Sequence, residues 1–478
     1  MKAILRFIII ALVATLGLAM IGALYLFFIP KATLFGIDYI SLNYIENSKA
    51  YASENIDTIE MTSHGYKVTV VPTKSENIYA KVYANSIGFV KKKNNTVKFN
   101  TEVTGGVVKL NISEPHGVTW KNNSYIELHV PQNKAFNFVL NNKSAKTYMS
   151  EANLKANKLT YKTSSGNMYL SNLAINNDID LNLAKAKCYI EDSVKLNNNN
   201  INLSFTSGDL IAKNMKFGSV AIIQNKGGTI EINSCNSIIS KVNAGGRYTI
   251  GTAGIVNVVS EDTNINIGTI TTGCSIDLTK SGKVEITNIN CAAASIETNT
   301  GDIKIENANE SISLKSDEGD IVVKNATKFV TIVNKYGNID VSYKTDIGNY
   351  DTTNKYRSAD ITNYNGKVSV KGIENIKLNI TNKGRANIEM RNVLGQNTIS
   401  GNLGDIHVVI NKDAAFDMSV SGTTGEVRVN FLELEESGGY TEHNIPPIVK
   451  INGGNADNTL TITGKKGDIK VVDTVLAG

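Results

Sequence analysis

Residues 301–318 read GDIKIENANESISLKSDE, and residues 319–336, GDIVVKNATKFVTIVNKY, repeat the same pattern at the same offsets. After the first glycine, Ile303 and Ile305 alternate with polar residues, which is the two-residue period of a strand with one buried face. The phrase of a glycine, a polar residue and two alternate apolar residues recurs every 18 or 19 residues between positions 282 and 337, and near multiples of that spacing elsewhere. A fixed period of this size is typical of a stacked repeat architecture.

Each repeat predicts two short strands and two turns, which form one coil of a β-solenoid. One coil cannot bury its apolar face or pair its backbone edges alone, so it relies on neighbours about 4.8 Å away on either side. We therefore predict an all-β fold, a single-stacked β-solenoid (β-helix) of about 16 coils of 18–21 residues, continuous over about residues 150–475. The residues expected to stack as its core are Ile303, Ile305, Ile321, Val323, Val330 and Ile332.

The N-terminal region predicts a membrane anchor. Residues 7–29 form an uncharged apolar run of 23 residues, long enough to cross a bilayer and longer than the usual signal-peptide core. Lys2 and Arg6 precede the run, which favours a cytoplasmic N-terminus with the rest of the chain outside. We expect a single-pass transmembrane helix in the cytoplasmic membrane, with cleavage after Ala19 or Ala23 as the alternative.

The period also divides the chain. In residues 50–147, apolar and polar residues alternate without the glycine spacing, which predicts a small β module. We expect this module to cap the solenoid, because exposed terminal strand edges invite aggregation. Glycine and proline pairs between residues 433 and 458 break the period and predict a long loop or distal cap. The expected parts are a cytoplasmic tip and anchor (1–30), a linker (31–49), the β module (50–147), the solenoid (148–432) and a loop with a terminal coil or cap (433–478).

No local pattern of catalytic or metal-binding residues is present. The four cysteines are Cys188, Cys235, Cys274 and Cys291, and their spacing matches no zinc or redox motif. Cys188 and Cys235 fall at inward positions, which suits small core residues. Cys274 and Cys291 lie in adjacent coils, so a disulfide between them is geometrically possible, although paired coils do not need a covalent cross-link. The five histidines are scattered, and no glycine-rich phosphate loop occurs. We predict no catalytic residues, no cofactor and no metal site.

Two charged features have ordinary explanations. Asp302, Asp320 and Asn338 occupy the same place in consecutive coils, where turn capping explains them better than a bound cation. The run at residues 91–93 is three lysines, but 49 basic residues against 44 acidic ones give a net charge of only +5. No basic stripe with interleaved aromatic residues appears, so we expect no nucleic-acid partner.

One insertion interrupts the regular coils. Gly337 and Gly366 are 29 residues apart where 18 is usual, and the extra residues fall at 343–358. Insertions in solenoids map to loops on one face, which is often a binding face, and tyrosine is favoured at recognition surfaces. A tolerated loop in a tyrosine-rich protein is the plainer explanation. The candidate partner-binding residues of this loop are Tyr343, Tyr350 and Tyr356.

With these residues in view, the chain resembles the bacterial putative-adhesin family of β-strand-repeat proteins, whose biochemical role is undefined. The resemblance rests on IDTIE at 56–60, VTVVPT at 68–73, IELHVP at 126–131 and the turns SGN at 165–167 and SGD at 207–209. It covers roughly residues 50–475. It implies a membrane-anchored, surface-facing β-solenoid and supplies no catalytic residues.

Three function classes follow from this sequence. The leading hypothesis is a non-enzymatic envelope protein, anchored in the membrane through residues 7–29, that presents an adhesin-like surface to a glycan or protein partner outside the cell. The first alternative is a carbohydrate-active β-helix enzyme, which needs ionisable groups from several coils in one lateral groove. The second is a structural protein that assembles end to end, which blocked ends would prevent. Handedness, cross-section and oligomeric state are not encoded in the pattern.

Overall fold

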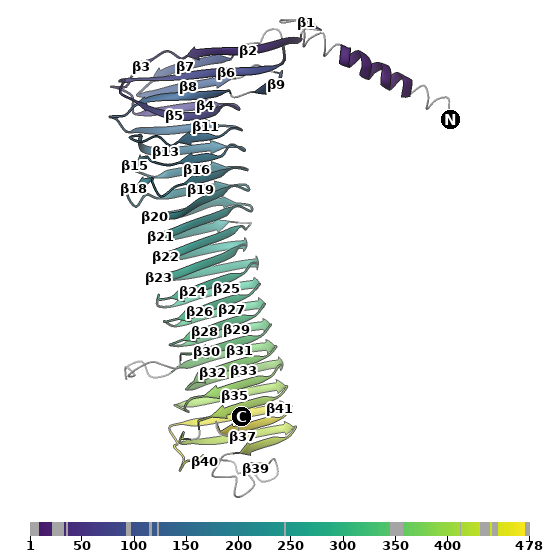
Figure 1. Cartoon of the computed structure of the whole chain (residues 1–478). Coiled ribbons are helices and arrows are strands. Elements are labelled where there is room, and N and C mark those ends of the chain that lie inside the picture. Colours follow the sequence, from purple (N-terminus) through teal and green to yellow (C-terminus); the bar gives the residue numbers. More distant parts are fainter. Residues whose placement is uncertain are drawn as a thin grey trace. The chain divides into compact units, whose positions relative to one another are not determined.

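The computed structural model describes residues 9–21, 33–34, 37–91, 97–113, 117–121, 124–242, 245–344, 357–411, 413–430, 440–441 and 448–473. The chain forms two compact units, Met1–Ala212 and Lys213–Gly478. Within each unit, the short strands of successive coils pair edge to edge, and the strand labels in Figure 1 mark this order. The sheet-rich, all-β architecture agrees with the predicted β-solenoid.

The predicted transmembrane helix is wrong. The described helix covers residues 9–21, which is about 20 Å at 1.5 Å per residue, whereas the hydrocarbon core of a bilayer is about 30 Å thick. Among the described residues, no helix is long and apolar enough to cross a membrane. Apolar composition alone therefore did not establish a membrane span for residues 7–29.

Two rows of strands form the stack of unit 1. Row I strands follow the glycine turn, and row II strands follow the next corner of the coil. In spatial order, row II consists of β8 (Val107–Ser113), β4 (Thr58–Ser63), β11 (Phe136–Asn142), β13 (Lys155–Thr163), β16 (Ile179–Leu183) and β19 (Ile201–Phe205). Row I consists of β6 (Asn77–Lys91), β10 (Tyr125–Pro131), β5 (Lys67–Thr73), β12 (Thr147–Met149), β14 (Met168–Leu170), β17 (Lys187–Ile190) and the start of β20 (Asp209–Asn225).

The coils of unit 1 do not stack in sequence order. The coil of β4 and β5 lies between the coil of β8 and β10 and the coil of β11 and β12. The outermost row I pairings are antiparallel, because β6 pairs with β10 and with β2 (Ile37–Asn47). The sheet pairing therefore crosses residue 147, the expected end of the β module, through β5 and β12.

Unit 2, taken by itself, also contains two rows of strands, row I after the glycine turn and row II after the next corner of the coil. It begins with the long strands β21 (Thr229–Val242), β22 (Arg247–Asp262) and β23 (Asn264–Ser281), which pair in parallel. Row I then consists of β24 (Val284–Ile289), β26 (Ile303–Ala308), β28 (Ile321–Ala326), β30 (Ile339–Tyr343), β32 (Val368–Ile373), β34 (Ala386–Met390) and β36 (Ile406–Ile410). Row II consists of β25 (Ala294–Thr300), β27 (Ile312–Glu318), β29 (Val330–Tyr336), β31 (Ser358–Asn365), β33 (Asn375–Lys383) and β35 (Gln396–Leu403).

The core of unit 2 lies between its two rows and matches the predicted inward positions. Ile303, Ile321 and Ile339 are paired neighbours in three consecutive coils, and at most 1% of any of them is exposed. Because each side chain rests on an apolar side chain of the next coil, burial is continuous along the stack. All six predicted core residues are buried, and so are the four cysteines, which are free thiols.

The glycine turns are held by close contact between coils. Gly301 and Gly319 have φ angles of +153° and +154°, which side-chain-bearing residues rarely adopt. A Cβ on Gly319 would lie 2.3 Å from the carbonyl oxygen of Gly301, closer than non-bonded atoms approach. The recurring glycine thus permits both the turn and the spacing of the coils.

We expect Gly319→Ala to lower the free energy of unfolding by about 2–4 kcal/mol, because the added methyl group clashes with backbone and the φ angle is unfavourable. Gly273→Ala is the matched control, since its Cβ would meet nothing within 4 Å. Guanidinium denaturation of both variants measures the difference. Equal stability of the two variants would show that the turn glycine is not required.

The distal end of unit 2 also departs from sequence order. The coil of β41 (Thr459–Lys466) and β42 (Ile469–Asp473) lies between the coil of β35 and β36 and the coil of β37 (Phe416–Thr424) and β38 (Val427–Asn430). Two short strands, β39 (Tyr440–Thr441) and β40 (Val449–Ile451), then pair antiparallel with β38 and β37. These pairings cover part of the edge that the last coil would otherwise expose.

Candidate functional site

Row I of unit 1 places a set of aromatic and lysine side chains on one outward sheet face. The triplets TYM, MYL and CYI of β12, β14 and β17 each bury their outer two residues and turn the central tyrosine outward. The parallel register then aligns these tyrosines with outward residues of β5, β10 and β6. We call this surface the aromatic–lysine face; it consists of Lys67, Tyr79, Lys81, Tyr83, Tyr125, Glu127, His129, Lys146, Tyr148, Tyr169 and Tyr189.

Three tyrosines of this face form a ladder. The ring centroids of Tyr148 and Tyr169 are 4.9 Å apart, and those of Tyr169 and Tyr189 are 5.0 Å apart, with interplanar angles of 10° and 7°. This separation is close to the spacing of neighbouring strands, so the backbone register sets it. The rings largely cover one another's faces, while their edges and hydroxyl groups point outward. Among the described residues, no hydrogen bond to any of these three hydroxyls is found.

A second aromatic group lies on β10 and β6, which β5 separates from the ladder. The Tyr83 and Tyr125 rings stack with centroids 4.2 Å apart, and Tyr79 stacks on His129 at 4.5 Å. Glu127 accepts a hydrogen bond from the Tyr83 hydroxyl at 3.3 Å, and its Oε2 lies 3.2 Å from His129 Nε2. Burial, followed by the proximity of Tyr83, raises the pKa of Tyr125, so this phenol stays neutral and able to donate a hydrogen bond.

The lysines of the face contact rings rather than carboxylates. Lys67 Nζ lies 4.8 Å from the Tyr148 ring centroid, and Lys146 Nζ lies 5.8 Å from that of Tyr169, both within cation–π range. No carboxylate of the described part of the chain forms an ion pair with either lysine. Lys187, in the same row of the sheet, instead pairs with Asp209 at 2.9 Å. Lys67 and Lys146 therefore keep their charge available to a ligand.

An open hollow of about 760 Å³ adjoins the face at the turn edge of row I. Lys67, Tyr125 and Lys146 belong to both the face and the hollow. The remaining wall comes from turns that precede the row I strands. Those turn residues are Gly65, Ser124, Ser144, Ala145, Ser165, Gly166 and Asn167. The described lining of the hollow thus consists of hydroxyl, amide and ammonium groups and includes no carboxylate.

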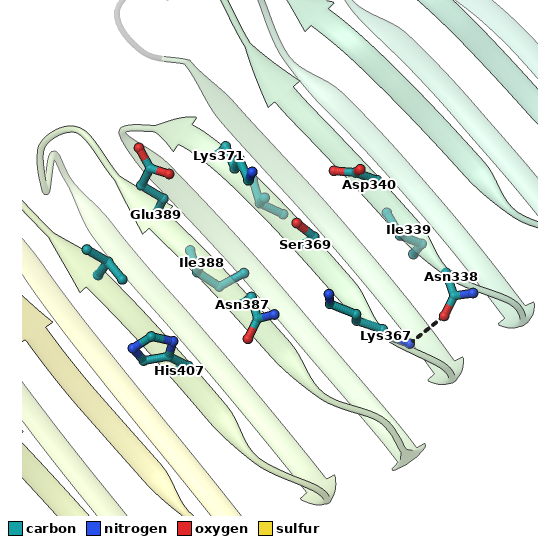
Figure 2. Close-up of a pocket in the computed structure, with 12 residues that line it drawn as sticks. Asn338, Ile339, Asp340, Lys367, Ser369, Lys371, Asn387, Ile388, Glu389 and His407 are labelled. Atoms are coloured by element: carbon teal, nitrogen blue, oxygen red, sulfur yellow. Dashed lines mark hydrogen bonds between the residues drawn. The ribbon is translucent and has the colours of Figure 1, made fainter. Parts of the chain in front are cut away.

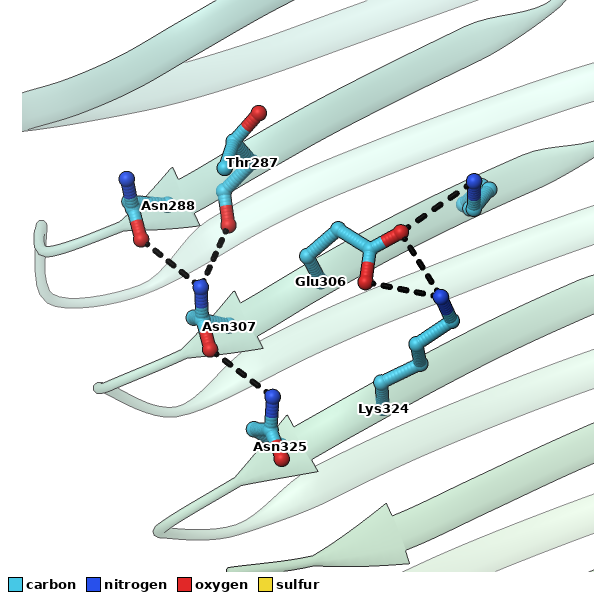
Figure 3. Close-up of polar contacts among 7 residues, drawn as sticks. Thr287, Asn288, Glu306, Asn307, Lys324 and Asn325 are labelled. Carbon is cyan, nitrogen blue, oxygen red and sulfur yellow. Dashed lines mark hydrogen bonds and ion pairs between the residues drawn. The ribbon is translucent and has the colours of Figure 1, made fainter.

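On the outward face of row I in unit 2, the polar side chains bind one another. Glu306 pairs with Lys304 at 3.1 Å and with Lys324 at 2.9 Å, and Figure 3 shows the contact with Lys324. These contacts, chiefly the hydrogen bond from Lys324, lower the pKa of Glu306. In the same view, Asn325 donates to Asn307 and Asn307 donates to Asn288, both at 2.9 Å. Polar groups that bind one another along the stack leave little for a partner.

The turn carboxylates likewise bind backbone. Asp302 Oδ1 accepts from the amide of Asp320 at 3.0 Å, and Asp320 Oδ1 accepts from the amide of Asn338 at 2.7 Å. This confirms the turn-capping interpretation, because each carboxylate holds the next coil. In the described ranges, no group of three or more His, Cys, Asp or Glu side chains could hold a metal ion.

A shallow depression of about 430 Å³ in unit 2 tests the enzyme alternative (Figure 2). It forms where the short Ser369 and Asn387 side chains lie among longer ones on β30, β32, β34 and β36. Its ionisable residues are Asp340, Lys367, Lys371, Glu389 and His407. A lateral groove with several ionisable groups therefore exists, as an enzyme would need.

The geometry of this depression does not suit glycoside hydrolysis. Asp340 pairs with Ser369 and Glu389 with Lys371, so the two acids lie two strands and two residues apart, about 12 Å between their backbone positions (Figure 2). Catalytic carboxyl pairs in glycosidases are about 5–9.5 Å apart. Burial, followed by Lys470, lowers the pKa of His407, which makes it neutral at physiological pH. The cysteines offer no nucleophile, since burial raises the pKa of Cys188, Cys235 and Cys274 to about 12.

The predicted loop tyrosines are only partly described. Tyr343 is buried, its hydroxyl donates to the Ser358 carbonyl at 2.6 Å, and burial raises its pKa. Tyr343 pairs with Ala326 of the preceding coil and occupies an inward-facing core position, where the insertion begins. Tyr350 and Tyr356 lie outside the described residues, so a binding role for the insertion stays a prediction.

The sequence reasoning did not find the aromatic–lysine face. A signal was present, because Tyr169 and Tyr189 occupy the same offset in consecutive coils. The sequence could not show that side chains of β5, β6 and β10 share this face. Those strands join the ladder strands only because β5 pairs with both β12 and β10, out of sequence order.

A protein-family model, Toastrack DUF4097, matches residues 56–365. The chain belongs to the Toastrack DUF4097 family. This confirms the resemblance to the putative-adhesin family of β-repeat proteins. As in other stacked folds, family membership fixes the scaffold, and function must be argued from the site. The whole aromatic–lysine face lies within the residues that match the Toastrack DUF4097 family.

Similar solved structures are also found. One is the crystal structure of a putative cell adhesion protein from Clostridium sporogenes, with 10% identity, a TM-score of 0.15, and coverage of 91% of this chain and 100% of that one. Another is a putative adhesin from Parabacteroides merdae, with 10% identity, a TM-score of 0.14, and coverage of 72% and 95%. No curated protein sequence matches this Toastrack DUF4097 chain.

Proposed function

We propose that this Toastrack DUF4097 protein is a non-enzymatic, adhesin-like protein of the cell surface that binds glycans through the aromatic–lysine face. The supporting observation is the alignment of the Tyr148, Tyr169 and Tyr189 hydroxyls with the lysines beside them. Tyrosine presents a rigid ring and a polar tip at low entropic cost, which suits recognition of hydroxyl-rich ligands. The sheet beneath the face is fully paired, so the groups are preorganised.

Binding is favoured over catalysis by the chemistry of the exposed groups. The face holds hydrogen-bond donors and cations, and its single carboxylate, Glu127, is already engaged by Tyr83 and close to His129. A general acid and base pair with poised pKa values is the usual requirement for hydrolysis. End-to-end assembly is disfavoured by the antiparallel strands β39 and β40, which lie along the last coil of unit 2.

Immobilised polysaccharides and the full chain test the proposal. We expect the protein to bind at least one member of a panel of dextran, mannan, polygalacturonate and chondroitin sulfate. Replacing Tyr148, Tyr169 and Tyr189 together by serine should weaken that binding at least about tenfold, because the rings and the phenolic hydroxyls at their tips are removed. Biolayer interferometry measures both, and the wild-type protein should release no reducing ends from the panel.

Tyr336→Ser is the control, because Tyr336 is 57% exposed and belongs to unit 2, whereas the face belongs to unit 1. Circular dichroism of each variant checks that the fold is retained. Failure to bind any panel member, or an equal loss in the control, would contradict the proposal. Release of reducing ends that is lost in Glu389→Gln would instead support an enzyme at the depression.

A further inference from the structure

The coils of the tyrosine ladder carry more lysines than carboxylates. Residues 141–190 contain seven lysines, no arginine and three acidic residues, a net charge of +4. Two of the three carboxylates are aspartates at 178 and 180, and Asp180 pairs with Lys158 at 2.7 Å. The field of this region is therefore set by lysines, and it favours a negatively charged partner.

Lys67 and Lys146 are neighbours in this field. The register β5–β12–β14 places Lys67, Lys146 and Asn167 side by side in one row, about 4.8 Å between strands. Two ammonium groups on adjacent strands repel each other, which is destabilising unless an anion lies near them. Ion pairs join most outward lysines of residues 261–335 to a carboxylate one coil away, such as Lys280 with Glu261 at 2.6 Å. The row at Lys67 and Lys146 lacks this compensation.

The neutral groups of the site point to the same chemistry. The hydroxyls of Tyr148, Tyr169 and Tyr189 can donate to oxyanions, as can the side chains of Ser144, Ser165 and Asn167 around the hollow. Hydrogen bonds to a charged acceptor are about twice as strong as neutral ones. The hydroxyl row and the lysine row run parallel across the strands, so both can follow an extended polymer.

We propose that the ligand of the aromatic–lysine face is a polyanionic polysaccharide. Its carboxylate, sulfate or phosphate groups lie against Lys67 and Lys146, and its sugar hydroxyls follow the row of tyrosine hydroxyls. This inference rests on the proposed function and adds the charge of the ligand. Single-stranded nucleic acid is disfavoured, because it binds by stacking bases on free aromatic faces, and the ladder rings cover one another.

The test uses the full chain and four probes at low salt: polygalacturonate, a phosphomannan, neutral dextran and the oligonucleotide (dT)20. We expect at least about tenfold tighter binding to an anionic polymer than to dextran, and weaker binding as salt is raised. A carboxylate polymer and a phosphate polymer both support the inference, and their relative affinity identifies the preferred oxyanion.

Matched variants assign the binding to the face. Lys67→Gln with Lys146→Gln should weaken anionic binding at least about tenfold and reduce its salt dependence, while the corresponding arginine pair should keep most of it. Lys158→Gln with Lys187→Gln removes the same charge from lysines that already have carboxylate partners, and should change affinity less than about threefold.

Each contrary outcome is distinct. Equal affinity for dextran and the anionic polymers would overturn the polyanion inference and leave the proposed function intact. Equal loss in the two glutamine pairs would show that net charge, rather than this site, is responsible. Tightest binding to (dT)20, lost in the Lys67 and Lys146 variant, would make the partner a nucleic acid. No binding to any polysaccharide would refute both proposals.

Discussion

Ile321→Asp is expected to destabilise unit 2 by several kcal/mol and to abolish its cooperative unfolding. Ile321 is fully buried, with Ile303 on one side and Ile339 on the other. A carboxylate there would lie in an apolar row with no hydrogen-bond donor supplied by its neighbours, and burying an unpaired charge is strongly unfavourable. The damage should spread, because each coil depends on its neighbours.

Val322→Asp is the matched control for this experiment. Val322 is the next residue along the strand and faces outward, between Lys304 and Asp340 of the adjacent coils. The same chemical change there should alter stability by less than about 1 kcal/mol. Thermal and guanidinium unfolding of both variants gives the comparison. Similar losses in the two would mean that the inward register of this strand is incorrect.

Removal of residues 459–473 is expected to be the most damaging truncation. These residues form a coil that pairs on one side with β35 and β36 and on the other side with β37 and β38. Both neighbouring coils therefore lose their pairing partner when it is removed. Without them, Leu460, Ile462 and Ile469 no longer cover the apolar faces of either neighbour, and all three are almost fully buried. We expect residues 416–430 to lose hydrogen-exchange protection and the melting temperature to fall.

Truncation after residue 473 is the control, since it keeps β41 and β42 and should unfold like the full chain. Hydrogen exchange followed by mass spectrometry locates the effect along the sequence. If residues 416–430 stay protected after loss of residues 459–473, that coil would be packing directly on β35 and β36, and the observed coil order would not be needed for stability.

The sequence alone determined the coil itself. The alternation at Ile303 and Ile305 fixed which side chains face inward, and the turn glycines at 301 and 319 fixed the corner, because both depend on contacts within one coil and with an equivalent neighbour. The turn role of Asp302 followed from the same logic. Local chemistry repeated at a constant spacing leaves few alternatives.

Tertiary structure alone decided which coil stacks on which. The edge of one coil is complementary to the edge of any other, so nothing in the period predicts that residues 58–73 or residues 459–473 lie between coils from elsewhere in the chain. The aromatic–lysine face depends on the position of the coil of residues 58–73 between two later coils, because this position brings Lys67 beside Tyr148. The burial of Tyr343 also required the structure, because composition does not fix which side chains are buried.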